Sequence, residues 1–178
     1  PATDSWSAIN TNGAPIGRDY STGVWTGTEL MVWGGHNGGE GALNDGGRYN
    51  LAANSWTQIT TNGAPTGRLS AAAIWTGSEM IVWGGGYQGQ HYNDGGRYNA
   101  AVGTWASIDL SSAPEGRSWH SADWSGTEMI VWGGRGVNQS FAFKDGGRYN
   151  PSTDNWPPIA APVTTVGRLN HTAVLAGT

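Results

Sequence analysis

Aromatic, amide and charged side chains gather in three stretches of this sequence. They read HNGGEGALN at residues 36–44, GYQGQHYN at residues 86–93 and RGVNQSFAFK at residues 135–144. Flat rings among Asn, Gln and Arg are the groups with which proteins stack on a polar ligand and hydrogen-bond to it. The alternative is that these rings fold back and pack against the scaffold. The three stretches are therefore the first candidates for a binding site.

The candidate ligand-binding residues come from these stretches and from a second variable patch that follows each Gly-Arg pair. The stretches contribute His36, Glu40, Tyr87, Gln90, His91, Tyr92, Arg135, Asn138, Gln139, Phe141 and Phe143. The second patch adds Tyr20, Trp119 and His120. No catalytic residue, metal ligand or cofactor is predicted.

Acid–base and metal chemistry have weaker support in the residue types. A pair of carboxylates would have to come from Asp19, Glu40, Glu115 or Asp123, and their spacing does not show them converging. Asp123 stands where the other repeats carry Val or Ile, so a buried carboxylate there would require a partner. The chain has four histidines and no cysteine, which excludes disulfides and thiolate metal sites. We therefore do not expect an enzyme.

Composition limits the partners that this chain can have. It has 178 residues and a formal net charge of −4, with no basic run, which argues against nucleic acid. No apolar stretch approaches the roughly 18 residues of a membrane span. Nearly identical repeats, 11 tryptophans and a single lysine favour a bacterial, exported protein. The expected location is extracellular or at the cell surface.

An internal repeat of about 50 residues organises the sequence. DGGRYN occurs at residues 45–50, 94–99 and 145–150, and VWGG occurs at residues 32–35, 82–85 and 131–134. Between VWGG and DGGRYN lie 9, 8 and 10 residues, whereas the other internal spacings are constant. Scaffolds hold their spacing and loops absorb change. The repeat is therefore a structural unit with one variable loop.

Each repeat predicts four short strands. The first strand is predicted at residues 21–25, 71–75, 120–124 and 171–175, and the fourth starts at Trp6, Trp56, Trp105 and Trp156. The second strand, ELMVW or EMIVW, is apolar on both faces, which is typical of a strand buried between stacked sheets. The third strand carries GGRY. In the last repeat the fourth strand reads WPPI, which fits only an edge strand and so indicates the outer rim.

These residues resemble a known family. The Gly-Gly doublet after an apolar strand, the Tyr of DGGRYN and the Trp at a fixed distance are similar to the kelch repeat. The resemblance covers nearly the whole chain. It implies an all-β fold, a kelch-type β-propeller segment of four-stranded antiparallel blades, with about 3.5 blades in an incomplete ring. Galactose oxidase also has kelch-type blades, but its copper site involves a cysteine, so that chemistry is not carried over.

The repeat boundaries predict five segments. These are an outer strand of a preceding blade with its connection at 1–17, blades at 18–67, 68–116 and 117–167, and the first strand of a following blade at 168–178. Such a segment does not close a ring, so we expect it to be part of a longer propeller. A homodimer that covers the open blade edges is the alternative.

Strand direction alternates within a blade, so the variable loops share one face with the GAPxGR-type connections, and the tight turns share the other face. The expected function is non-enzymatic binding of a protein or a glycan on the loop face. One alternative is a glycan-active kelch enzyme, mutarotase-like or oxidase-like, whose site needs further blades. Another is a purely structural repeat array. The Asp and Arg of DGGRYN are expected to form hydrogen-bonded pairs, and the repeated Gly-Arg to bond one blade to the next.

Overall fold

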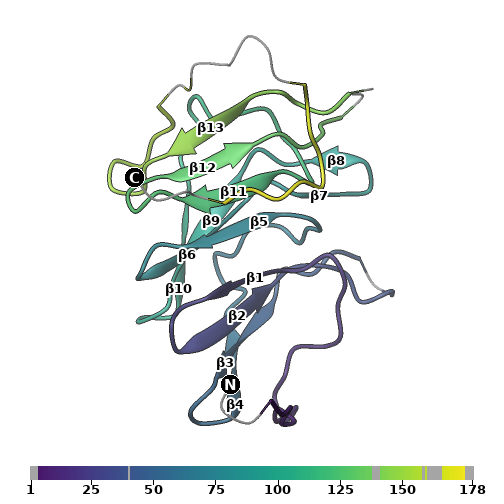
Figure 1. Cartoon of the computed structure of the whole chain (residues 1–178), viewed down its shortest axis with the longest axis vertical. Coiled ribbons are helices and arrows are strands. Elements are labelled where there is room, and N and C mark those ends of the chain that lie inside the picture. The colour runs from purple at the N-terminus through teal and green to yellow at the C-terminus, as the bar shows by residue number, and fades with distance from the viewer. Residues whose placement is uncertain (1–3, 40, 138–140, 158, 160–165, 175–178) are drawn as a thin grey trace.

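The computed structural model describes residues 4–39, 41–137, 141–157, 159 and 166–174. The secondary structure of these residues consists of strands, and they contain no helix (Figure 1). Consequently, no helix in this part of the chain is long and apolar enough to cross a membrane. The predicted all-β class is confirmed.

Most of the strands form three antiparallel sheets that follow one another along the chain. Sheet 1 contains β1 (Thr22–Trp25), β2 (Glu29–Trp33), β3 (Gly46–Asn50) and β4 (Ser55–Ile59). Sheet 2 contains β5 (Ala72–Trp75), β6 (Glu79–Trp83), β9 (Gly95–Asn99) and β10 (Thr104–Ser107). Sheet 3 contains β11 (Ser121–Trp124), β12 (Met129–Trp132) and β13 (Gly146–Tyr149). A separate small hairpin joins β7 (Gly86–Tyr87) to β8 (Gln90–His91) in the loop of sheet 2.

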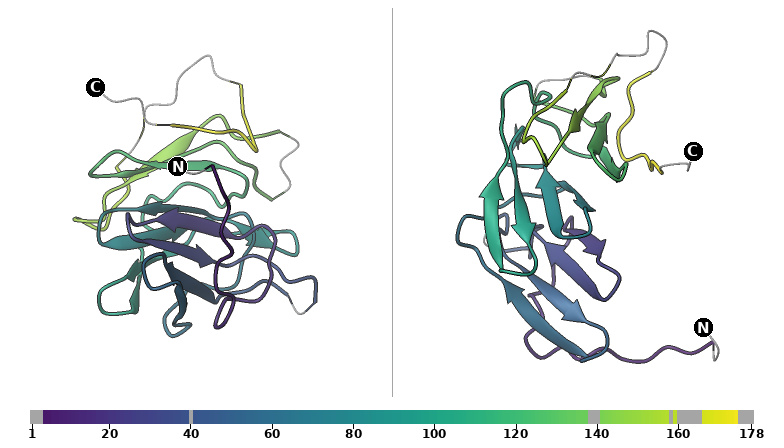
Figure 2. Two further views of the ribbon diagram at one scale, coloured as in Figure 1. Left: turned by 60° about the horizontal axis from the view of Figure 1, so that its bottom comes forward. Right: turned by 90° about the vertical axis from the view of Figure 1, so that its left-hand side faces the viewer.

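The three sheets stack as successive blades of a propeller segment. Figures 1 and 2 show them arranged along an arc, and the first strands β1, β5 and β11 contact one another in order. Strands β4 and β10 lie at the opposite edges of their sheets. The sheets do not close a ring within the described residues. This arrangement brings the starts of the three first strands together.

The first strands begin one residue later than predicted, at Thr22, Ala72 and Ser121. The reason is the length of their partners. Thr22 pairs with Trp33, the last residue of β2, and the two glycines that follow have positive φ and leave the ladder. The residue before Thr22 therefore has no strand to pair with.

Two copies of the predicted fourth strand and one of the predicted first strand are wrong. Residues 6–9 form no strand and Trp6 is fully exposed, because no third strand lies beside them among the described residues. Trp156 and Pro157 also lie outside any strand, since proline has no N–H to donate to β13; one bridge between Asn150 and Asn155 remains. Residues 171–174 form no strand, and residue 175 lies outside the described residues.

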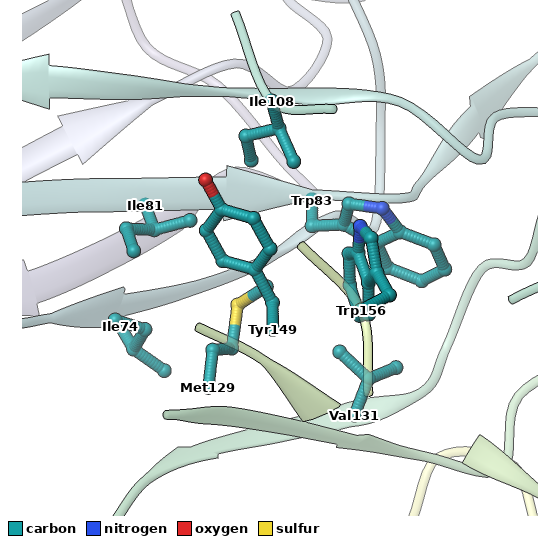
Figure 3. Packing of buried hydrophobic residues seen from close by; sticks show 8 residues of the cluster. All are labelled: Ile74, Ile81, Trp83, Ile108, Met129, Val131, Tyr149 and Trp156. Carbon is teal, nitrogen blue, oxygen red and sulfur yellow. The ribbon is translucent and has the colours of Figure 1, made fainter. Parts of the chain in front are cut away.

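Large aromatic rings fill the spaces between sheets. Between sheets 2 and 3, the rings of Trp83 and Trp156 have centroids 5.2 Å apart, and Tyr149 packs on Trp156 at the same distance (Figure 3). Between sheets 1 and 2, Trp33 and Trp105 repeat the contact at 5.6 Å. The Trp of the first two VWGG motifs therefore packs on Trp105 or Trp156 of the following repeat, and neither sheet buries its aromatic face alone.

Arg68 ties sheet 2 to sheet 1. Its side chain is fully buried, and Nη1 donates to the carbonyl oxygens of Gly84 (3.0 Å) and Asp94 (3.1 Å) and to Oδ1 of Asp94 (2.7 Å). Its backbone N–H donates to the carbonyl of Leu43 in sheet 1 at 3.3 Å, and its carbonyl accepts from the N–H of Gly35 at 2.8 Å. The predicted blade-to-blade role of the Gly-Arg repeat is confirmed at this position. Arg18 and Arg117 make the same three side-chain bonds within sheets 1 and 3.

The Asp and Arg of one DGGRYN motif pair with different partners rather than with each other. Asp94 binds Arg68, whereas Arg97 binds Glu79 with Nη2 at 2.8 Å from Oε2. Nη1 of Arg97 also donates to the carbonyl of Pro151, in the turn that follows β13, at 2.9 Å. The two charges of the motif therefore form ion pairs at opposite ends of the sheet. Asp94 lies near the loop face, and Arg97 lies near the face with the tight turns.

The second glycine of DGGRYN is required by close packing. A Cβ on Gly96 would lie 2.8 Å from Cγ of Pro65 and 2.9 Å from Cε3 of Trp105. Both neighbours are ring atoms that cannot move aside cheaply. The φ of Gly96 is not positive, so close approach, rather than an unusual backbone conformation, explains this glycine.

Candidate functional site

A groove of about 1000 Å³ opens on the loop face, where the first strands begin. It is lined by Tyr20 and Ser21 from sheet 1, by residues 69–71 and 86–91 from sheet 2, by residues 118–120 from sheet 3, and by Asn170 and His171. Six predicted ligand-binding residues meet here: Tyr20, Tyr87, Gln90, His91, Trp119 and His120. The arc therefore brings together side chains that are up to about 150 positions apart in the sequence.

The floor of the groove is a run of backbone hydrogen bonds that crosses the sheets. The N–H of Ser70 donates to the carbonyl of Tyr20 (2.9 Å), that of Trp119 to Ser70 (3.4 Å), and that of Asn170 to Trp119 (3.0 Å). All four residues have positive φ, between 51° and 58°. Left-handed conformations are uncommon for residues other than glycine and cost energy. The backbone bonds hold these residues, so their side chains are free to differ from repeat to repeat.

The β7–β8 hairpin forms one wall of the groove. Its two turn residues, Gln88 and Gly89, both have positive φ, as tight two-residue hairpins require. Nδ1 of His91 lies 2.8 Å from Oγ of Ser118, and its ring is 5.8 Å from that of Trp119. Burial, and to a lesser extent the charge of Arg135, lower the pKa of His91. The imidazole is therefore neutral near pH 7 and ties the hairpin to sheet 3.

His120 lines the bottom of the groove and is almost fully buried. The residue is 8% exposed, and both ring nitrogens are shielded from solvent with no hydrogen-bond partner among the described residues. Burial, helped by the charge of Arg117, lowers its pKa to about 3. A Cβ on Gly84 would lie 3.1 Å from Nε2, so the ring fills the space left by that glycine. His120 is therefore a neutral side chain that packs between sheets 2 and 3.

The groove offers no charged side chain for chemistry. Its described lining includes no Asp, Glu, Lys or Arg. Across residues 4–39, 41–137, 141–157, 159 and 166–174, no three His, Asp or Glu side chains lie where they could hold a metal ion. The carboxylate candidates Asp19, Glu115 and Asp123 do not line the groove, and Glu40 lies outside the described residues. The site is suited to binding an uncharged group by ring contact and hydrogen bonds.

Two loop aromatics among the predicted ligand-binding residues pack on the buried arginines. The guanidinium carbon of Arg68 lies 4.4 Å from the ring centroid of Tyr92, and that of Arg117 lies 4.2 Å from that of Phe143. These are cation–π contacts within the scaffold. Both rings stand two residues before the Asp of DGGRYN, and this constant spacing is the sequence signal that separates them from the variable loop.

The remaining candidates lie outside the groove or outside the described residues. Nδ1 of His36 accepts from the N–H of Gly38 at 2.9 Å and closes a turn of its own loop. Arg135 is exposed and bridges to Ser118 through its backbone, and Phe141 is 83% exposed away from the groove lining. Glu40, Asn138 and Gln139 lie outside the described residues.

The candidate list missed several polar groups of the groove, which are Ser70, Gln88, Ser118 and Asn170. Three of them directly or almost directly follow a Gly-Arg pair. Their position in the repeat, rather than their residue type, was the signal that could have found them. Asp123, which takes the place of Val24 and Ile74, is half-buried on β11.

The stacked sheets of three or four strands, with repeated Gly-Gly, Tyr and Trp at their junctions and a groove where the first strands meet, define a β-propeller repeat protein. The chain belongs to the kelch-repeat family: the family model described as the KLHDC2/KLHL20/DRC7 Kelch-repeats domain matches residues 1–178. No curated protein matches the chain. Kelch-repeat domains commonly serve as protein-interaction modules and are typically non-enzymatic.

Proposed function

We propose that this chain is a non-enzymatic binding module that holds an extended, uncharged segment of a partner protein in the groove. The observation that carries the proposal is the groove itself. It gathers exposed rings and amides from successive sheets over a floor fixed by backbone hydrogen bonds. Because this floor is rigid, less conformational entropy is lost on binding.

The side chains of the groove suit a protein segment. Tyr20 and Trp119 are 62% and 37% exposed, and these residue types dominate the binding energy of protein interfaces. Gln88, Gln90 and Asn170 supply amide groups that can donate to and accept from a peptide backbone. The segment is uncharged where it enters, because an unpaired charge is costly to bury.

The proposal is non-enzymatic because the groove provides no acid–base pair. General acid–base catalysis needs a titratable group within hydrogen-bond reach of the substrate. Three histidines line the groove. His91 is bonded to Ser118, Nε2 of His171 is 3.0 Å from Oγ of Ser121, and both nitrogens of His120 and Nδ1 of His171 are shielded from solvent. None of the three is poised to exchange a proton with a bound molecule.

The test uses peptides selected from a random library against the intact chain, with affinities measured by isothermal titration calorimetry. Trp119→Ala and Tyr20→Ala should each weaken binding at least tenfold, which is typical of an exposed aromatic anchor. Phe141→Ala is the control, since it removes an exposed ring outside the groove and should leave affinity unchanged. Selected peptides that bind both groove variants as well as the wild type would refute the proposal.

We also propose a bacterial, extracellular or cell-surface setting, supported by the single lysine, the absence of cysteine and the nearly identical repeats. Immunodetection in secreted and cytoplasmic fractions of the source cells tests it.

Homodimer formation is a further proposal, supported by the 49% exposure of Trp25, whose counterpart Trp75 packs against a core cluster. Light scattering on the purified chain measures its mass.

A further inference from the structure

Two clefts on the face opposite the groove occupy equivalent places in successive repeats. The first lies between sheets 1 and 2 and has a volume of about 480 Å³; the second lies between sheets 2 and 3 and measures about 490 Å³. We call them cleft 1 and cleft 2. Both open beside the tight turns that join the first and second strands, at residues 26–28, 76–78 and 125–127. Ligand sites of small molecules fall in this range of volumes.

An arginine–glutamate pair lies in each cleft with almost the same geometry. In cleft 1, Nη2 of Arg48 is 2.7 Å from Oε2 of Glu29; in cleft 2, Nη2 of Arg97 is 2.8 Å from Oε2 of Glu79. The exposed fractions of the side chains are 21% and 18% in the first pair and 21% and 17% in the second. The same partly exposed arginine–glutamate ion pair therefore occurs in two successive repeats.

Each glutamate keeps one carboxylate oxygen available. Arg48 and Arg97 each direct Nε and Nη2 to Oε2 alone. Oε1 of Glu29 is approached only by Nδ2 of Asn50 at 3.5 Å, and Oε1 of Glu79 has no donor among the described residues. A hydrogen bond from a hydroxyl to such an oxygen is charge-assisted and short. The paired arginine keeps the cleft close to neutral overall.

The remaining walls supply a ring and hydroxyl groups. Trp75 lines cleft 1 and Trp124 lines cleft 2, each from the first strand of the following sheet. Thr28 belongs to cleft 1 and Thr127 to cleft 2, and Ser78 lines both. An indole face, an available carboxylate oxygen and small hydroxyls match a ligand that has both C–H faces and several O–H groups.

We propose that each cleft binds one sugar unit of a neutral glycan, so that a polysaccharide chain lies across the turn face of the arc. Two like sites in register match a ligand made of like units, since the second contact is then intramolecular and gains from effective concentration. A protein partner without internal repeats presents no such repeat of one chemical group. This inference is independent of the function proposed for the groove on the other face.

The test blocks each cleft with a bulky ring at an exposed position. Ala101→Trp fills cleft 1 and Ser152→Trp fills cleft 2, because these residues line the two clefts and stand at matching places in the repeat. Ala52→Trp is the matched control: Ala52 takes the same place in the first repeat and lines neither cleft. Circular dichroism melting confirms that the variants are folded.

The probes are short oligosaccharides of glucose, mannose, galactose and N-acetylglucosamine, and the readout is stoichiometry by isothermal titration calorimetry. The wild type and Ala52→Trp should bind two molecules of the preferred sugar per chain, each single-cleft variant one, and the double variant none. The matching polysaccharide should bind the wild type at least 10-fold more tightly than it binds either single-cleft variant. The absence of binding by all four sugars, or binding that survives the double variant, would overturn the inference.

Discussion

The imidazole of His120 stands edge-on against the indole of Trp83, with ring centroids 5.3 Å apart and ring planes at 77°. The two residues belong to different sheets, so this contact closes part of the junction between sheets 2 and 3. In the first two repeats the place of His120 is taken by Ser21 and Ala71, which are much smaller. This place in the repeat is therefore taken by a titratable ring at His120 and His171 and by small residues in the first two repeats.

Acid should weaken the fold through His120. Burial lowers its pKa to about 3 from 6.5, so below pH 6.5 the unfolded chain binds a proton that the folded chain does not. Stability should be independent of this group above pH 6.5 and should fall as the pH decreases toward 3, by on the order of 1 kcal/mol per pH unit. Denaturant unfolding from pH 7 to pH 4 measures the slope.

His120→Phe is the control for this pH dependence, because it keeps a ring of similar size and cannot be protonated. The difference in unfolding free energy between wild type and variant should shrink or change sign as the pH falls. Parallel pH profiles for the two proteins would show that His120 does not cause the effect.

Arg68→Met should destabilise the protein strongly. It removes a fully buried guanidinium and leaves the carbonyl groups of Gly84 and Asp94 without that donor. Breaking a buried charged hydrogen-bond network costs about 3–5 kcal/mol. Asp94→Asn should cost about 1 kcal/mol or less, because the Asp94 side chain is 41% exposed and screened by solvent. Equal losses for the two variants, measured by urea unfolding, would contradict this order.

The same substitution should have different effects in different repeats. Glu29→Gln breaks a close pair in which Arg48 donates from Nε at 2.9 Å and Nη2 at 2.7 Å, and should cost about 1–3 kcal/mol. Glu128→Gln changes a looser pair, 3.6 Å from Nη1 of Arg148, and should stay within about 0.5 kcal/mol. Thermal unfolding of both variants under one buffer condition measures the difference, and a larger loss at Glu128 would disprove it.

Two phenylalanines from one loop should differ in their contribution to stability. Phe143→Ala removes a ring 4.2 Å from the buried Arg117 guanidinium and should cost about 2 kcal/mol or more. Phe141→Ala should change stability by less than about 0.5 kcal/mol, since that ring is 83% exposed. Urea titrations of the two variants test this contrast. A similar cost for both would mean that Phe141 also packs.

Much of the fold could be predicted because the same structural motifs occur three times in the sequence. The constant spacing of Gly-Arg, VWGG and DGGRYN indicated which residues belong to the scaffold. The buried arginines, the close-packed glycines and the stacked tryptophans of these motifs do have structural roles. The failures occur where a partner element is missing or chemically blocked. Trp6 has the spacing of a fourth strand but no neighbouring third strand among the described residues, and Pro157 lacks the N–H that pairing requires.

The binding site was harder to predict, because residue type in a loop does not say where a side chain points. Tyr92 and Tyr87 lie five positions apart in one loop, yet one packs on Arg68 and the other lines the groove. Nothing in the sequence indicated that the clefts on the turn face could be binding sites. Their parts are conventional repeat residues, and only the stacking of one sheet on the next makes them converge.

The segments EMIVW at Glu79–Trp83 and at residues 128–132 show what each level decides. The sequence by itself determined that both are apolar strands of a repeated four-stranded unit. The tertiary structure decided their environments: after Glu79 every residue of β6 is buried between sheets 1 and 3, whereas in β12 Ile130 and Trp132 are only half-buried. Burial depends on the area covered by neighbouring sheets, so identical residues acquire different surroundings when only one of them has a sheet on both sides.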